Sequence, residues 1–188
     1  GQKWVKLTGD APTISFRDLA IQRRENDLVG ASFGRGFWIL DDYSPLRDVN
    51  ADALEQEALL FNPRKAWWYI QRGLLGFGEK ASQGAGYYTA PNPPFGAVFT
   101  YYLKDSLTTL TDERQKSEKA LLDDEQNTPI ASWEDLEAER REQAPVVLLT
   151  VRDSNGDIVR RLEGPAKAGL HRVTWDLSYP STGAVGVP

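Results

Sequence analysis

The side chains with which this chain could perform chemistry are few. His171 is the only histidine, and the 188 residues include no cysteine. A Ser-His-Asp triad would therefore have to use His171. In the alternating pattern of a strand, however, His171 shares a face with Val173 and Trp175. We expect a histidine at the edge of a core that bonds to the backbone, and we predict no catalytic residue.

The sequence predicts no metal and no cofactor. A single histidine without any cysteine excludes a structural zinc site of the usual kind. The segment Asp153–Asp157 begins like a calcium loop, with oxygen-bearing side chains at alternate positions. Ile158 occupies the sixth loop position, where an EF-hand requires glycine, and Asn155-Gly156 between apolar segments is typical of a tight hairpin. We therefore predict that this segment is a turn.

Paired acidic residues could indicate glycoside hydrolysis, which uses two carboxylates. Asp41-Asp42 and Glu134-Asp135 are such pairs, but neighbours along a strand point to opposite faces. Three arginines could form a clamp for a carboxylate ligand: Arg17, Arg35 and Arg64. We expect these arginines to pack their stems on aromatic rings and to hold turns instead.

Aromatic residues are the best candidates for a binding surface. They are Trp67, Trp68, Tyr69, Tyr87 and Tyr88. Adjacent side chains on a strand alternate between its faces, so these rings cannot all enter one core. An outward ring can stack on a sugar or on a partner protein. The alternative is that a second layer covers the outer face, for example a neighbouring domain, a helical segment or the glycine-rich loop Gly73–Gly86.

Composition argues against two kinds of partner. The net charge of −5 argues against nucleic acid, because phosphate binding relies on clustered Lys and Arg. No apolar run approaches the roughly 18 residues that a membrane span needs, so we predict no segment that crosses a membrane. The chain begins with Gly1 and contains no methionine. We interpret it as a fragment of a longer protein, whose signal peptide would lie outside these residues.

The spacing of apolar residues predicts a mainly β fold with two helices inserted late in the chain. Val146–Leu177 is expected to form three consecutive antiparallel strands, as in a β-sandwich, with Trp175 in the core. Phe37–Leu40 is apolar on both faces, so we expect both faces to be covered. The other expected strands are Trp4–Leu7, Thr13–Gln22, Asp27–Phe33, Ala66–Ile70 and Ala97–Leu103. The expected helices are Asp52–Leu60, Leu107–Asn127 and a helix from Ser132, which opens a capping-box pattern, to about Gln143.

Two stretches resemble known families. Pro12–Leu46 resembles the final repeat of secreted bacterial β-propeller proteins of the BNR-repeat, sialidase-like and sortilin-like group. The matching residues are Arg17-Asp-Leu-Ala-Ile21, Asn26-Asp-Leu-Val29 and Gly34-Arg-Gly-Phe37. Asp153–Trp175, which ends in Gly169-x-His-x-Val-x-Trp175, resembles the Ig-like domain of the flagellar hook-cap protein. The Ser-x-Asp-x-Gly-x-x-Trp box of the propeller repeats is absent, so no propeller active site is carried over.

This resemblance implies a partial propeller blade over residues 1–45. It also implies an Ig-like β-sandwich over residues 46–188, with a helical insertion around residues 106–144. The implied function is a non-catalytic structural or binding module at the C-terminal end of a larger secreted or periplasmic propeller protein. The implied partners are the remainder of that protein and a carbohydrate or protein ligand. The alternative is an accessory domain of a sialidase-like glycoside hydrolase that supports carbohydrate binding.

Overall fold

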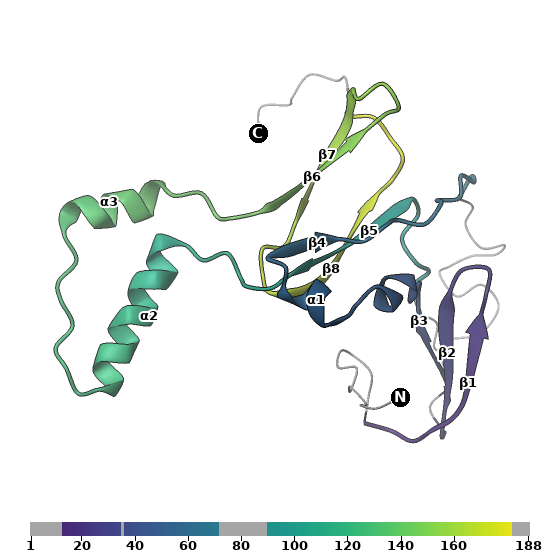
Figure 1. The fold of residues 1–188 in the computed structure, drawn as a ribbon, viewed down its shortest axis with the longest axis horizontal. Helices are drawn as coiled ribbons and strands as arrows, with labels where there is room; N and C mark the ends of the chain where they lie inside the picture. Colours follow the sequence, from purple (N-terminus) through teal and green to yellow (C-terminus); the bar gives the residue numbers. More distant parts are fainter. Residues whose placement is uncertain (1–12, 35, 72–89, 182–188) are drawn as a thin grey trace, which may run out of the picture. The chain divides into compact units, whose positions relative to one another are not determined.

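The computed structural model describes residues 13–34, 36–71 and 90–181 (Figure 1). The chain divides into two compact units, Gly1–Asn50 and Ala51–Pro188. Antiparallel strands in open sheets make the fold mainly β, as the sequence predicts. The expected strand Trp4–Leu7 and the glycine-rich loop Gly73–Gly86 lie outside the described residues. The expected domain boundary after residue 45 stays a prediction.

The first unit contains a three-stranded meander. Its elements are β1 Phe16–Gln22, β2 Asp27–Ser32, β3 Phe37–Leu40 and the 3-10 helix η1 Ser44–Arg47. The strands pair antiparallel in the order β1-β2-β3. Asn26, between β1 and β2, has a φ of +59°, and Gly34 and Gly36, between β2 and β3, have φ values of +73° and +80°. These left-handed conformations favour Asn and Gly, so both hairpins turn where the sequence predicts.

The second unit contains a sheet in the order β4-β5-β8. Its elements are α1 Ala51–Glu55, β4 Ala58–Leu60, β5 Ala97–Leu103 and β8 Gly169–Trp175. The expected helix Asp52–Leu60 is wrong beyond Glu55, because β4 pairs with the second half of β5 instead. The edge of β5 supplies backbone partners to this apolar segment, and the Phe61 amide donates to the Thr100 carbonyl oxygen at 3.0 Å.

The strands β6 Val147–Arg152 and β7 Ile158–Gly164 form the expected antiparallel hairpin. The turn between them is confirmed: the Asp153 amide donates to the Asp157 carbonyl oxygen at 3.0 Å, and Gly156 has a φ of +90°. The third expected strand, β8, contacts β7 but takes its ladder hydrogen bonds from β5. The expectation of three consecutive paired strands is therefore wrong for the last of them, since β5 offers β8 a full seven-residue ladder.

In the second unit, four apolar side chains are buried: Ala53, Phe61, Tyr101 and Leu103; in the first unit, Pro45 of η1 is buried. Tyr101 is the most buried of the four, with 2% of its surface exposed, and its hydroxyl donates to the Pro165 carbonyl oxygen at 2.5 Å. Trp175 is half-buried, so its expected core position is wrong. It lies at the end of β8 opposite Ala97, where β5 begins, and its indole Nε1 donates to the Ser178 carbonyl oxygen at 2.8 Å.

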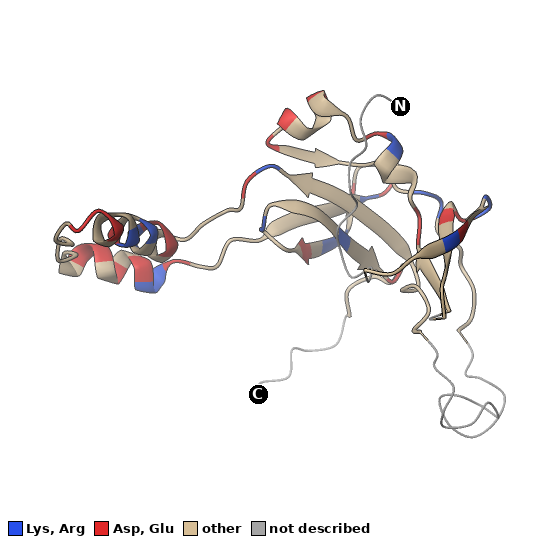
Figure 2. Cartoon of the chain, turned by 90° about the horizontal axis from the view of Figure 1, so that it is seen from below, with Lys and Arg blue, Asp and Glu red and all other residues tan. Residues whose placement is uncertain are grey.

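Two helices lie between β5 and β6, where the sequence predicts them: α2 Leu110–Asp123 and α3 Trp133–Arg141. Thr109 and Ser132 cap them, each accepting a hydrogen bond at 3.1 Å from the amide three residues later. No residue of these two helices, both fully described, is buried. Figure 2 shows that Asp and Glu residues are frequent on both helices. Within the described residues, no helix combines the length and apolar character that a bilayer crossing requires.

Candidate functional site

The expected aromatic binding residues lie in an extended segment and not in a strand. Residues 61–71 form no helix or strand, so the expected strand Ala66–Ile70 is wrong. Pro63 near the start of this segment lacks the amide hydrogen that a sheet ladder needs. Trp67, Trp68 and Tyr69 are all exposed, Trp68 by 73%. The two remaining candidates, Tyr87 and Tyr88, lie outside the described residues.

Phe95 brings two of these rings together. Its ring centroid lies 5.0 Å from that of Tyr69 and 6.1 Å from that of Trp68, and both pairs are edge-to-face. Each such pair stabilises the folded state by about 0.5–1.5 kcal/mol in addition to the contribution from buried apolar area. We call Trp67, Trp68, Tyr69 and Phe95 the aromatic cluster. Phe95 was missed in the sequence, because a single ring after a proline-rich stretch carries no periodic signal.

Gly96 fixes how the chain passes from Phe95 into β5. Its φ is +121°, and a Cβ at this position would lie 2.8 Å from the Trp175 carbonyl carbon and 3.0 Å from the Asp176 Cα. No other residue fits this backbone, so the orientation of the Phe95 segment at the start of β5 depends on this glycine. The exposed rings of the aromatic cluster can stack on a flat apolar surface such as a sugar ring or an aliphatic side chain.

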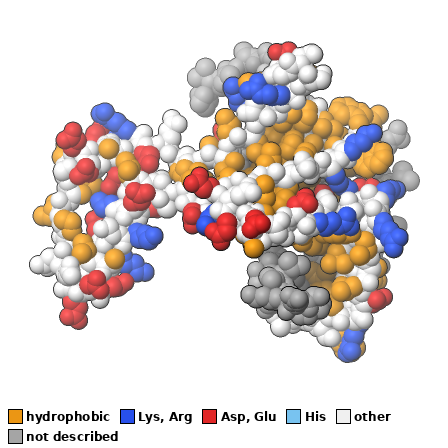
Figure 3. Space-filling model, in the orientation of Figure 1, with side chains coloured by type: hydrophobic (Ala, Val, Ile, Leu, Met, Phe, Trp, Pro, Cys, Tyr) orange, Lys and Arg blue, Asp and Glu red, His pale blue; other side chains and the backbone are white. Residues whose placement is uncertain are grey.

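The sheet β1-β2-β3 has apolar side chains on both faces. By strand register, Leu19 and Ile21 share one face with Trp38, whereas Phe37 and Ile39 lie on the other. Four of these are exposed: Leu19, Ile21, Phe37 and Ile39. Figure 3 shows hydrophobic side chains at the surface over this sheet. The expectation that both faces of Phe37–Leu40 are covered is therefore wrong within this chain, because Phe37 and Ile39 on one face are exposed.

The helices α2 and α3 are held together by charged groups. The Arg114 guanidinium donates to both carboxylate oxygens of Glu139, at 2.6 and 3.0 Å, and to Glu118 at 2.7 Å. The hydrogen bonds from Arg114, together with one from Thr111, hold the pKa of Glu139 below its ordinary value. The same bonds to Glu139 and Glu118 raise the pKa of Arg114. A bidentate pair of this kind fixes the relative position of two helices that share no buried side chain.

Structural contacts are seen for three of the residues considered for catalysis: His171, Arg17 and Asp135. The Nε2 atom of His171 lies 2.6 Å from the Lys167 carbonyl oxygen, as expected for a core-edge histidine bonded to backbone. The Arg17 guanidinium lies 4.9 Å from the centroid of the Phe33 ring. Asp135 bonds to Ser132 at the start of α3. Arg35 lies outside the described residues.

Asp153 uses one of its carboxylate oxygens within the expected turn. One carboxylate oxygen of Asp153 accepts hydrogen bonds from the amides of Asn155 and Asp157, at 2.9 and 3.0 Å. Across the described ranges, no three His, Cys, Asp or Glu side chains come together in a group that could hold a metal ion.

Comparison with known proteins adds no relative: no family model matches the chain, and no similar curated protein or solved structure was found.

Proposed function

We propose that the chain is a non-catalytic structural module of a larger secreted propeller protein. In this proposal the sheet β1-β2-β3 is a blade that packs between neighbouring sheets of the same protein, and the second unit is an Ig-like sandwich. The observation that supports it most is the pair of apolar faces on a three-stranded sheet. Exposed apolar residues scattered singly need no explanation, but four on the two faces of one small sheet do.

The energetic argument favours a covering layer on each face. Removing a large aliphatic or aromatic side chain from water stabilises by about 1.5–3 kcal/mol. Covering Leu19 and Ile21 on one face, and Phe37 and Ile39 on the other, therefore contributes several kcal/mol on each side. A further sheet that packs about 10 Å away buries such residues with regular side-chain alternation.

The test compares the chain alone with the longer propeller protein that this proposal predicts. We would replace Phe37 and Ile39 together by threonine, which keeps β propensity and removes apolar surface. The stability of the chain alone should change little, because both side chains are already exposed. The longer protein should lose at least about 2 kcal/mol of unfolding free energy, because the same side chains are buried there.

The matched control is Leu60→Thr, at an exposed position on β4 of the second unit. It should have a small effect in both proteins. If the double substitution Phe37→Thr, Ile39→Thr leaves the unfolding midpoint of the longer protein unchanged, the sheet β1-β2-β3 does not pack against other sheets of that protein and the proposal is wrong.

Exposed indole rings favour a second candidate, an accessory domain that supports carbohydrate binding by a sialidase-like glycoside hydrolase. Trp67 and Trp68 are exposed in an extended segment, which suits stacking on sugar rings. Titration with sialylated and neutral oligosaccharides by calorimetry would test it. Binding that Trp68→Ala removes, and that Trp133→Ala at another exposed indole leaves intact, would favour this candidate. Absence of binding to either class would exclude it.

A further inference from the structure

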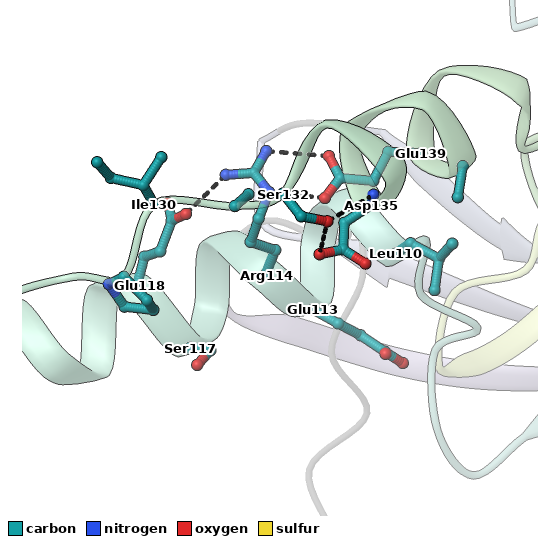
Figure 4. Close-up of a pocket in the computed structure, with 12 residues that line it drawn as sticks. Leu110, Glu113, Arg114, Ser117, Glu118, Ile130, Ser132, Asp135 and Glu139 are labelled. Carbon is teal, nitrogen blue, oxygen red and sulfur yellow. Dashed lines mark hydrogen bonds and ion pairs between the residues drawn. The ribbon is translucent and has the colours of Figure 1, made fainter.

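A pocket of about 510 Å³ lies between α2 on one side and α3 with the segment that leads into it on the other (Figure 4). This volume lies within the roughly 300–1,000 Å³ that is common for ligand sites. Leu110, Ile130 and Ala138 supply apolar lining, and Ile130 is 99% exposed. Glu113 and Asp135 supply acidic lining. Ile130 therefore stands at the open rim of the pocket, in full contact with water, where an incoming apolar side chain can cover it.

The helical insertion concentrates the negative charge of the chain. Residues 106–144 contain eleven Asp and Glu against five Lys and Arg, a net charge of −6. The rest of the chain has sixteen acidic against seventeen basic residues, a net charge of +1. The pocket lining itself carries a net charge of −3, because Arg114 lies among four acidic residues, Glu113, Glu118, Asp135 and Glu139. The potential around the pocket is therefore negative, which favours a positively charged occupant.

We infer that this pocket binds a basic segment of a partner protein, with a large apolar side chain inserted against Ile130. The inference is independent of the proposed function, because it concerns only the helical insertion. An apolar anchor in a pocket with charged residues at the rim is the usual arrangement of a peptide-binding groove. A second copy of the chain is a poor occupant, because two insertions of charge −6 repel each other. Nucleic acid and anionic membrane surfaces are repelled for the same reason.

The test uses the full chain and a short fluorescein-labelled peptide of Leu and Lys that forms a basic amphipathic helix. Fluorescence anisotropy should show saturable binding. A peptide with Glu in place of Lys should not bind, and neither should one with Ser in place of Leu, because charge and anchor are both needed. Raising the salt concentration from about 0.05 M to about 0.3 M should weaken binding by about threefold or more, because surface charges are then screened.

Two pairs of variants locate the site. Ile130→Ser should weaken binding by about tenfold, whereas Leu122→Ser, at an exposed position of α2 that does not line the pocket, should change it by less than about twofold. Glu113→Gln should weaken binding by about twofold, and Glu163→Gln on β7 should have no effect. Far-UV circular dichroism should show that each variant keeps its helices.

Three results would overturn the inference. The first is that the Leu-Lys peptide does not bind at low salt. The second is equal binding of the Leu-Glu peptide, which would mean that the charge of residues 106–144 is irrelevant. The third is that Ile130→Ser and Leu122→Ser weaken binding equally, which would mean that the peptide adheres to any exposed apolar residue and not to the pocket.

Discussion

The contact between Tyr101 and Gly164 permits a quantitative test of how the second unit is packed. Tyr101 on β5 is almost fully buried, and its hydroxyl bonds to the Pro165 carbonyl oxygen, next to the end of β7. A Cβ on Gly164 would lie 3.0 Å from the Cε1 and Cζ atoms of the Tyr101 ring and still closer to the hydroxyl. Gly164→Ala should therefore displace the ring and cost about 2 kcal/mol of unfolding free energy, as overpacking of a core commonly does.

Tyr101→Phe removes the hydroxyl and leaves the Pro165 carbonyl without this donor, which should cost about 1–2 kcal/mol. In the double variant the closest clash is gone, while the ring carbons still crowd the new methyl group. When Phe occupies position 101, Gly164→Ala should therefore lower the free energy of unfolding by only about 1 kcal/mol. The difference from the loss expected with Tyr is a coupling energy of about 1 kcal/mol between the two sites. Tyr102→Phe is the matched control: its hydroxyl bonds to the Leu54 carbonyl oxygen at 3.2 Å in an exposed position, so the loss should be under about 1 kcal/mol.

Urea titrations of the four proteins in the cycle, followed by circular dichroism, would measure these values. If Gly164→Ala costs the same with Tyr and with Phe at position 101, the hydroxyl does not lie against Gly164 and the reasoning is refuted. Burial also raises the pKa of Tyr101 above its ordinary 10.0. The raised pKa contributes stability that is fully present below pH 10 and is lost as the pH rises through the folded-state pKa. Tyr101→Phe should remove this part of the alkaline loss.

Three further predictions concern the helices and the aromatic cluster. Glu139→Gln should reduce the helical signal in circular dichroism at neutral pH. The lowered pKa of Glu139 contributes stability that is present above its ordinary value of 4.5 and is lost as the pH falls through the folded-state pKa, so the variant should lack this acid-induced loss of helical signal. An acid profile equal to that of the unaltered chain would contradict the role of Arg114. Ser132→Ala removes the cap of α3 and should destabilise this helix by about 1 kcal/mol. Hydrogen exchange of the Asp135 amide should become faster, and an unchanged exchange rate would contradict the role of this cap. Trp68→Ala should cost under about 1 kcal/mol, and a larger fall in the urea midpoint would show that the ring is buried.

Much of the local structure could be predicted from the sequence, because local rules decide it. Ala97–Leu103 forms a strand over its predicted span, since its β-branched and aromatic residues suit a sheet. Asn155-Gly156 marks a hairpin through the φ that glycine adopts there. The helix after Ser132 follows from its capping pattern. Prediction failed at Ala58–Leu60, where a short apolar segment suits a helix and a strand equally and the edge of β5 decides.

The candidate site could be predicted only in part, because its contacts join residues that no spacing rule connects. The sequence identifies Trp68 and Tyr69 as candidate binding residues, but Phe95 meets them only through the folded backbone. The pair Arg114 and Glu139 spans 25 positions, whereas helical spacing rules reach four. The sequence shows that β3 is apolar on both faces, but the expectation that both faces are covered is wrong, because Phe37 and Ile39 are exposed.

The position of α2 and α3 between β5 and β6 has a consequence for the order of folding. β5 ends at Leu103 and β8 begins at Gly169, so their ladder can form only after a long loop closes. The entropic cost of closing a loop rises by about 0.6 kcal/mol for each doubling of its length. The contact between Arg114 and Glu139 shortens the path between the two strands, and the β6-β7 hairpin shortens it again. We expect both to form before the β5-β8 ladder, so substitutions in the helical pair should slow folding more than they speed unfolding.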